Sequence, residues 1–259
     1  MPCLQLMDPD QLYDELLHEA KNTWTFPGFS LESVEFFDDY PVSMDDSNEW
    51  WRSKILEYER SLKPEFEEFF ASLINVISKF DRGIQTEPSQ CIGRPTSQNK
   101  GQANPYRWGA IHSANSDKRI DVQFFLNLTS IGLRIGIYSG KHSFEPKAWS
   151  ARQRKITSKK DQIFSLIKKL EEKGYRMHVT TGKDHAARTG GRTFQPADAE
   201  EMLKFVIENC QLDVLKTIDI RNISPREMME QVLGAFAETR LLYQLLQPSS
   251  YSPYARDLV

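Results

Sequence analysis

The spacing of apolar residues predicts a helix near each end of the chain. In residues 8–21 Leu12, Leu16, Leu17 and Ala20 lie on one helical face behind Asp8 and Pro9, residue types that suit a helix cap and a first helical position. Residues 224–246 begin with the capping-box sequence Ser-Pro-Arg-Glu and continue with the same spacing. We therefore expect helices over these two segments.

Helical spacing also marks the interior of the chain. Residues 47–80 are expected to form two consecutive helices or one helix kinked at Pro64, because proline cannot donate the helical hydrogen bond. A further amphipathic helix is predicted from Ser158, with Asp161 completing a cap-like box, to Gly174. The weaker patterns predict a helix over residues 196–210 and a short strand over 31–37.

Segments rich in β-branched and aromatic residues indicate an antiparallel sheet. The first three, Tyr106–Ala114, Arg119–Leu128 and Ile131–Tyr138, are separated by short turns and predict a meander. Strands are also expected over 175–180 and 214–220. The fold class that follows is α+β, a single domain with a mainly antiparallel sheet and helices packed on one side.

In the third of these strands, large aliphatic residues alternate with glycine, arginine and tyrosine. Ile131 and every second residue after it are apolar, which predicts a buried face. Gly132 and Gly136 lie on the other face and leave room there for another backbone or a ligand.

Composition shifts divide the chain into three parts. Residues 1–47 are an acidic helix and aromatic arm, 48–247 the main α+β domain, and 248–259 a tail or linker. Residues 81–105 are rich in Gly, Pro, Ser, Gln and Asn and predict a long surface loop. The three cysteines form no Cys-x-x-Cys pair, and no apolar run reaches membrane-spanning length, so we expect a cytoplasmic protein without a membrane partner.

Charge is distributed unevenly along the chain. Residues 1–90 hold 19 acidic and 7 basic side chains, whereas residues 139–193 hold 14 basic and 5 acidic ones. A segment of net charge +9 can meet nucleic-acid phosphates, an acidic partner or the protein's own acidic N-terminal third. The expected phosphate contacts are Arg94, Lys100, Arg107, Arg152, Arg154, Lys155, Lys159, Lys160, Lys183, Arg188 and Arg192. Such runs are equally often only solvated faces.

Flat side chains beside these cations are candidates for base stacking. Tyr106 and Trp108 lie at the start of the predicted strand Tyr106–Ala114 and are the preferred pair, although large aromatic residues more often belong to a core.

Known catalytic signatures are absent from the sequence. There is no His-Glu-x-x-His, Gly-x-Ser-x-Gly or phosphate-binding glycine loop, and His178-Val179-Thr180 is only half of a two-histidine phosphoesterase motif. We therefore predict no catalytic residue, no metal and no cofactor. An enzyme would instead require Asp121, His112 and His178 to converge in one pocket.

One family resemblance covers most of residues 48–247. Glu49-Trp50-Trp51, Tyr58, Phe66, Phe69-Phe70, Leu73 and Asp81, followed by Arg94, Asn104-Pro105-Tyr106-Arg107 and the helix from Ser224 to Leu246, resemble an uncharacterised family of bacterial and fungal proteins. Its helix pair leads to an arginine-rich loop that ends in Pro-Tyr-Lys, then to strands and a closing helix. Residues 93–100 depart from the family's dense arginine core. The resemblance implies an architecture and not a reaction.

A weaker resemblance concerns residues 101–108, which are similar in outline to the N-terminal DNA-binding domains of McrB-type restriction systems. It implies that Tyr106 and Trp108 line a pocket for a flipped base. We therefore predict a nucleic-acid-binding module, with DNA favoured, of a prokaryotic defence or restriction system, with ATPase or nuclease activity carried by a partner subunit or a longer polypeptide. The alternatives are a phosphoesterase or nuclease-like enzyme and a protein–protein interaction domain.

Overall fold

The computed structural model describes residues 7–96, 102–116, 122–139, 146–181, 192–193 and 210–247. Nine of the labelled elements are helical: α1 (Pro9–Thr23), α2 (Leu31–Glu35), the 3-10 turn η2 (Met44–Asp46), α3 (Ser47–Glu57), α4 (Lys63–Ile77), α5 (Pro88–Cys91), α6 (Pro146–Ser158), α7 (Lys160–Glu172) and α9 (Pro225–Leu246). A tenth, η3 (Tyr58–Leu62), is a π-helical turn. The strands are β1 (Arg107–Ile111), β2 (Gln123–Thr129), β3 (Gly132–Ser139), β4 (Arg176–Thr181), β5 (Arg192–Thr193) and β6 (Cys210–Ile218).

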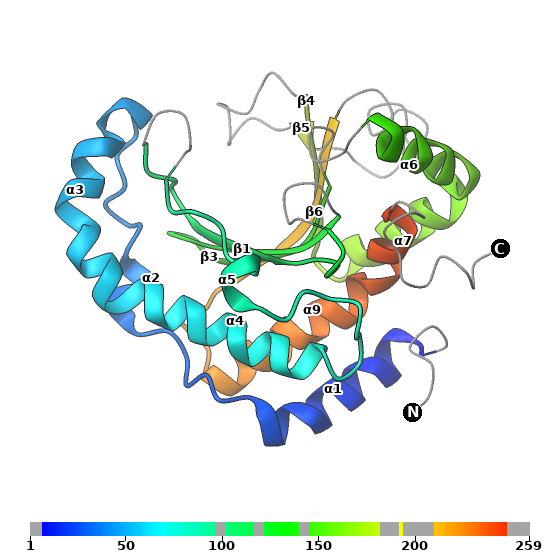
Figure 1. Ribbon diagram of the computed structural model, residues 1–259, viewed down its shortest axis with the longest axis horizontal. Coiled ribbons are helices and arrows are strands. Elements are labelled where there is room, and N and C mark those ends of the chain that lie inside the picture. Colours follow the sequence, from blue (N-terminus) through cyan, green and yellow to red (C-terminus); the bar gives the residue numbers. More distant parts are fainter. Residues whose placement is uncertain are drawn as a thin grey trace.

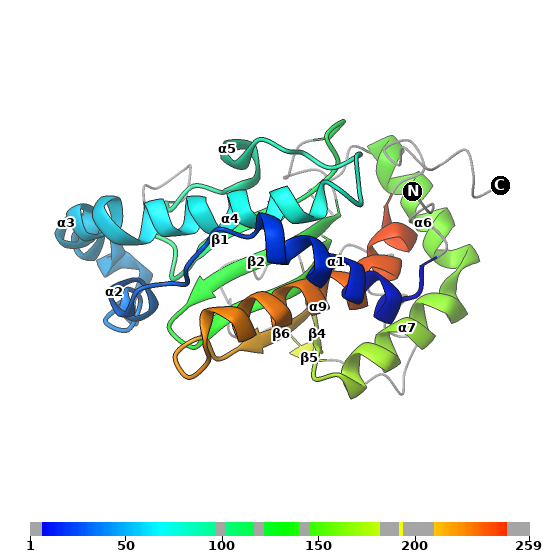
Figure 2. The same ribbon diagram turned by 90° about the horizontal axis from the view of Figure 1, so that it is seen from below.

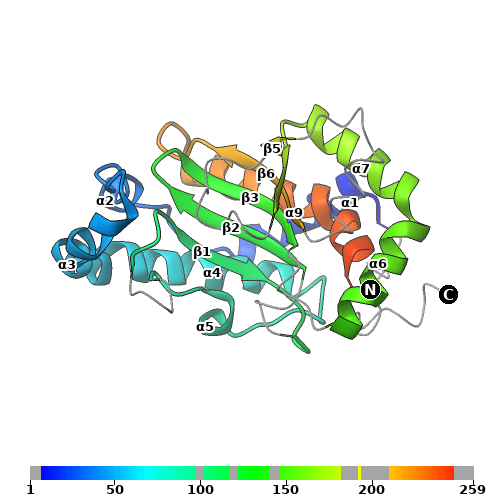
Figure 3. The same ribbon diagram turned by 90° about the horizontal axis from the view of Figure 1, so that it is seen from above.

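The strands form one antiparallel sheet in the order β1-β2-β3-β6-β4-β5. Helices α1, α4 and α9 lie on one side of it, as Figure 1 and the view from below in Figure 2 show. Seen from above, the opposite face of β1, β2, β3 and β6 is crossed by no described helix (Figure 3). The predicted α+β class, with an antiparallel sheet and helices packed on one side, is confirmed.

The core lies between the sheet and these helices. Leu12 and Leu16 of α1, a run of α4 phenylalanines and the inward residues of β2 and β3 belong to one cluster of buried side chains. Phe69 and Phe70 are fully buried and pack edge to face. Thus α1, which belongs to the predicted N-terminal arm, contributes to the same core as the main domain. None of the described helices combines the length and apolarity needed to cross a membrane.

The predicted caps at the two outer helices are confirmed. The Asp8 carboxylate accepts from the N–H groups of Asp10 and Gln11, and Ser224 and Glu227 form a reciprocal capping box. Both caps work because each partner lies within three residues, so the sequence alone brings them together.

Three local predictions are wrong. Residues 31–35 are helical, because the Ser30 hydroxyl accepts from the N–H of Ser33 and caps the turn. Ile131 is exposed, because it occupies the turn between Thr129 and Gly132, which pair across the β2–β3 hairpin. Ser158 does not cap α7: its hydroxyl donates to the carbonyl of Lys155 at the end of α6.

The proline at position 64 is accommodated without a break. The π turn η3 joins α3 to α4 immediately before it, and the single extra residue of a π turn relieves the helical hydrogen-bond pattern that proline cannot complete. The predicted helix over 196–210 lies outside the described residues apart from Cys210, which begins β6.

Candidate functional site

The most basic described surface lies at the junction of α6 and α7. Residues 146–160 contain 6 basic residues and no acidic one. Arg154, Lys159 and Lys160 are exposed there, and we call these three the α6–α7 basic patch. Within the described ranges, no carboxylate lies at ion-pair distance from any of the three. The side chain of Arg152, on the same helix, lies outside the described residues.

Lys155, from the same run, has a structural role. Its Nζ donates to the carbonyl oxygens of Gln244 and Gln247, at 2.9 and 3.0 Å, and so completes the C-terminal end of α9. Burial, with a smaller contribution from the charge of Lys159, lowers the pKa of Lys155. Lys155 therefore does not belong to the candidate phosphate surface, a correction that depends on a contact with a helix about ninety residues further along the chain.

Arg107 does not belong to the candidate phosphate surface either. Its side chain is buried, with Nη1 donating to the carbonyl of Gly93 and the guanidinium lying over the rings of Tyr58 and Phe66. The guanidinium carbon lies 5.5 Å from the Tyr58 centroid and 5.4 Å from that of Phe66. Burial lowers the pKa of Arg107 and raises that of Tyr58 to about 12. A cation enclosed in this way cannot reach a phosphate.

The remaining predicted contacts are spread along the chain. Arg94 is exposed beside the edge strand β1, next to the isolated bridge between Ile92 and Gly109. Arg192 is described only by its backbone, which pairs β5 with β4 at Val179. Lys100, Lys183 and Arg188 lie outside the described residues.

The two stacking candidates are both half-buried. Trp108 stacks on Phe125, with 5.9 Å between centroids and an angle of 29° between planes. Its other neighbour is the backbone of Gly93, where a Cβ would lie 1.9 Å from the indole ring. A glycine is therefore required at position 93 for the segment before β1 to lie against this tryptophan. Tyr106 lies directly before β1.

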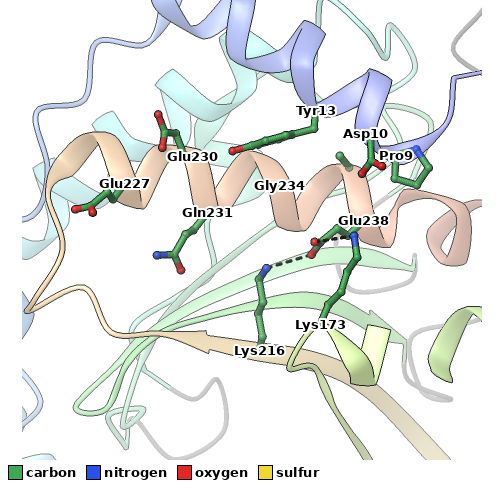
Figure 4. Close-up of a pocket in the computed structure, with 11 residues that line it drawn as sticks. Pro9, Asp10, Tyr13, Lys173, Lys216, Glu227, Glu230, Gln231, Gly234 and Glu238 are labelled. Atoms are coloured by element: carbon green, nitrogen blue, oxygen red, sulfur yellow. Dashed lines mark hydrogen bonds and ion pairs between the residues drawn. The ribbon is translucent and has the colours of Figure 1, made fainter. Parts of the chain in front are cut away.

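A pocket of about 400 Å³ lies between α1, α9 and the sheet (Figure 4). One of its lining residues is Glu238, whose carboxylate accepts from the Tyr175 hydroxyl at 2.8 Å and from Lys216 at 3.1 Å, and pairs with Lys173 at 3.2 Å. Burial alone would raise the pKa of Glu238, but the hydrogen bond from Tyr175 and the charge of Lys216 hold it below its ordinary value. Lys173 is thereby neutralised by the protein itself.

Most other charged groups of this pocket also have partners within the protein. Glu230 pairs with Arg226, and Glu227 belongs to the capping box of α9. Tyr13 lies along α9 above Gly234 in Figure 4, and burial together with the charge of Glu230 raises its pKa. The contacts of Glu238 join α9 to β6 and to the segment after α7, which makes the pocket a structural junction rather than a set of unused groups.

The described residues hold no convergent catalytic set. His112 is buried and its Nδ1 donates to the carbonyl of Ser113 at 3.0 Å. Asp121 and the side chain of His178 lie outside the described residues, so their predicted convergence is untested. Among the described side chains no group of histidine, cysteine and carboxylate residues has the arrangement of a metal site.

The fold and surface therefore define an α+β protein with a one-sided helical layer and a localised basic patch. The chain matches, over residues 32–244, the model of a family of conserved hypothetical proteins, DUF2461, and it belongs to that family. The predicted membership of an uncharacterised family is confirmed, and the match begins sixteen residues before the predicted resemblance. No curated protein matches the chain.

Proposed function

We propose that the protein binds nucleic acid, with DNA favoured, through the α6–α7 basic patch. The observation that carries the proposal is the exposure of Arg154, Lys159 and Lys160 within seven residues of chain that contain no acidic side chain. Cations grouped in this way can follow successive phosphates and release the counterions condensed on them. Phosphate contacts of this kind give affinity and little sequence preference.

The pairing of the other charges supports this assignment. Carboxylates of the acidic first third form ion pairs with Lys54, Arg60, Lys63 and Arg221, all of which lie outside residues 139–193. These carboxylates thus form their ion pairs within the helical layer or at its junction with the sheet. Their use there leaves the positive charge of the α6–α7 patch available to an external anion.

The proposal predicts that reversing the patch charges weakens binding. In the variant Arg154→Glu, Lys159→Glu, Lys160→Glu we expect affinity for a fluorescently labelled duplex to fall by about tenfold or more at low salt. The slope of log K against log salt should also become shallower by about 2 to 3 units, since each lost phosphate contact removes about 0.9. Fluorescence anisotropy over a salt series measures both quantities for duplex DNA, duplex RNA and single strands.

A matched control carries the same charge change elsewhere. Arg52, Lys79 and Arg82 are exposed cations on α3 and after α4, and their reversal to glutamate alters net charge equally. We expect this control to change affinity only slightly, because long-range attraction is screened at moderate salt. Equal losses in the two variants, or binding by the unmodified protein that is absent or independent of salt, would overturn the proposal.

A further inference from the structure

Three rows of side chains run across the strands on the sheet face opposite α4 and α9. Successive side chains of a strand point to opposite faces of the sheet. This face therefore carries the residues that alternate with the core-facing ones. The pairing of the strands then aligns Trp108, Asn127, Arg134 and Thr217 in one row. The next row contains Ala110, Phe125, Gly136, Leu215 and Arg176, and the third contains Gln123, Tyr138 and Asp213.

The centre of this face is apolar and aromatic. Phe125 lies between Trp108 and Tyr138, with centroid distances of 5.9 and 5.4 Å and interplanar angles of 29° and 32°. Gly136, the cross-strand partner of Phe125, contributes no side chain. The three aromatic residues are only half-buried. They therefore present flat apolar surface on which another planar ring can stack.

Asn127 lies beside Trp108 in the first row, and the carbonyl oxygen of its side chain is unsatisfied. Its side chain is only 3% exposed, and the buried Oδ1 has no hydrogen-bond partner among the described residues. Leaving a buried carbonyl oxygen unpaired is costly, so such groups are nearly always satisfied in native proteins. The unpaired oxygen indicates a ligand that supplies an N–H donor at this position.

Arg134 is the cross-strand neighbour of Asn127 on β3. It is half-buried, and no carboxylate in the described part of the chain pairs with it. A guanidinium carried by the residue paired with Asn127 suits a ligand that has an anionic group such as a phosphate.

We propose that Trp108, Phe125, Asn127, Arg134 and Tyr138 form a nucleotide-binding platform. The ring of a base stacks on the aromatic residues, its amino group and adjacent ring nitrogen meet the Asn127 amide, and its phosphate meets Arg134. An amide offers one acceptor and one donor side by side, which is the complement of adenine. The ligand is either a free nucleotide or an unstacked base of a strand, and the platform does not depend on the α6–α7 basic patch.

Adenosine and adenosine 5′-monophosphate test the assignment of Arg134. Calorimetric titration of the full chain is expected to give tighter binding of the monophosphate. In Arg134→Gln that preference should disappear, through a loss of about tenfold for the monophosphate and little change for adenosine. The matched variant Arg52→Gln, an exposed arginine on α3, should behave like the unmodified protein.

Asn127→Leu separates a ligand-binding role from a structural one. Replacing a buried amide whose oxygen is unpaired with an apolar group of similar shape should raise the melting temperature, while binding of the monophosphate falls by about tenfold or more. The control Asn75→Leu, at an exposed position of α4, should leave binding unchanged. A lower melting temperature for Asn127→Leu together with unchanged binding would show that Asn127 only supports the sheet, and would overturn the proposal.

A short single-stranded oligodeoxyadenylate distinguishes the two sources of ligand. Binding of the mononucleotide that is unaffected by reversal of the α6–α7 patch indicates a free nucleotide. Binding of the oligonucleotide alone, sensitive to both Arg134→Gln and the patch reversal, indicates a base presented by a strand. If neither probe binds at concentrations up to about 10 mM, where even weak specific ligands are detected, the platform proposal fails, whatever the outcome for duplex DNA.

Discussion

The variant Gly136→Ala is expected to be strongly destabilised. Gly136 lies in β3 with φ of +151°, and a Cβ built there would lie 2.0 Å from the carbonyl oxygen of Val214 in β6. A backbone atom cannot swing aside as a flexible side chain does, so β3 and β6 would have to separate. Together with the strained φ, this should cost about 3 kcal/mol or more. Chemical denaturation followed by circular dichroism measures the loss.

The variant Gly234→Ala provides the control, because there the change from glycine to alanine should raise the free energy of unfolding. Gly234 lies inside α9, where a Cβ would meet Tyr13 at an ordinary 3.5 Å. Alanine favours a helix interior over glycine by about 0.5–1 kcal/mol, so Gly234→Ala should be mildly stabilising. If Gly136→Ala proved as stable as the unmodified protein, the close approach of β3 and β6 described above would be wrong.

The second large effect is expected at the junction of α9 with the sheet. Glu238→Gln removes the charge that pairs with Lys173 and Lys216 and accepts from Tyr175. Lys216 and the Tyr175 hydroxyl would keep their partially buried positions without that charge. We expect a loss of about 2 kcal/mol, below the usual cost of breaking a fully buried pair because solvent screens this one.

The effect should depend on pH in a defined direction. Because the folded-state pKa of Glu238 lies below its ordinary value of 4.5, its contribution is fully present above that value and is lost as the pH falls through the folded pKa. Glu238→Gln should therefore lower the free energy of unfolding near neutral pH and flatten its decline in acid. Glu230→Gln, which breaks only an exposed pair on the same helix, should cost about 0.5 kcal/mol or less. Similar losses in the two variants would contradict the central role of Glu238.

These stability effects bear on the two proposed surfaces differently. Gly136 is the cross-strand partner of Phe125 in the nucleotide-binding platform, so its substitution cannot be used to test ligand binding independently of folding. Glu238 lies on the opposite side of the sheet, since its partner Lys216 points toward α9. A folded Glu238→Gln variant should therefore retain nucleotide binding at the platform. Comparing these variants separates loss of structure from loss of a contact.

Much of the architecture could be predicted because its causes are local. Asp8 and Ser224 cap helices through partners within three residues, and the meander β1-β2-β3 follows from β-rich segments that succeed one another along the chain. The predicted strand was wrong at residues 31–35. There the cap formed by the Ser30 side chain stabilises a helix despite the strand propensity of the nearby aromatic residues. The uneven distribution of charge was also visible in the sequence, because a count of charged residues in each segment is enough to show it.

The role of each cation was decided by the tertiary structure. Arg107 and Lys155 have the same residue types as Arg154 and Lys159, yet one is enclosed by Tyr58 and Phe66 and the other caps α9. The alignment of Trp108, Asn127 and Arg134 likewise exists only once three strands pair in register. The sequence by itself determined most of the described helices and strands and the amount of charge, since these depend mainly on neighbours along the chain. Only the fold decided which charges are buried, paired or exposed, because desolvation and pairing depend on residues that are distant in sequence.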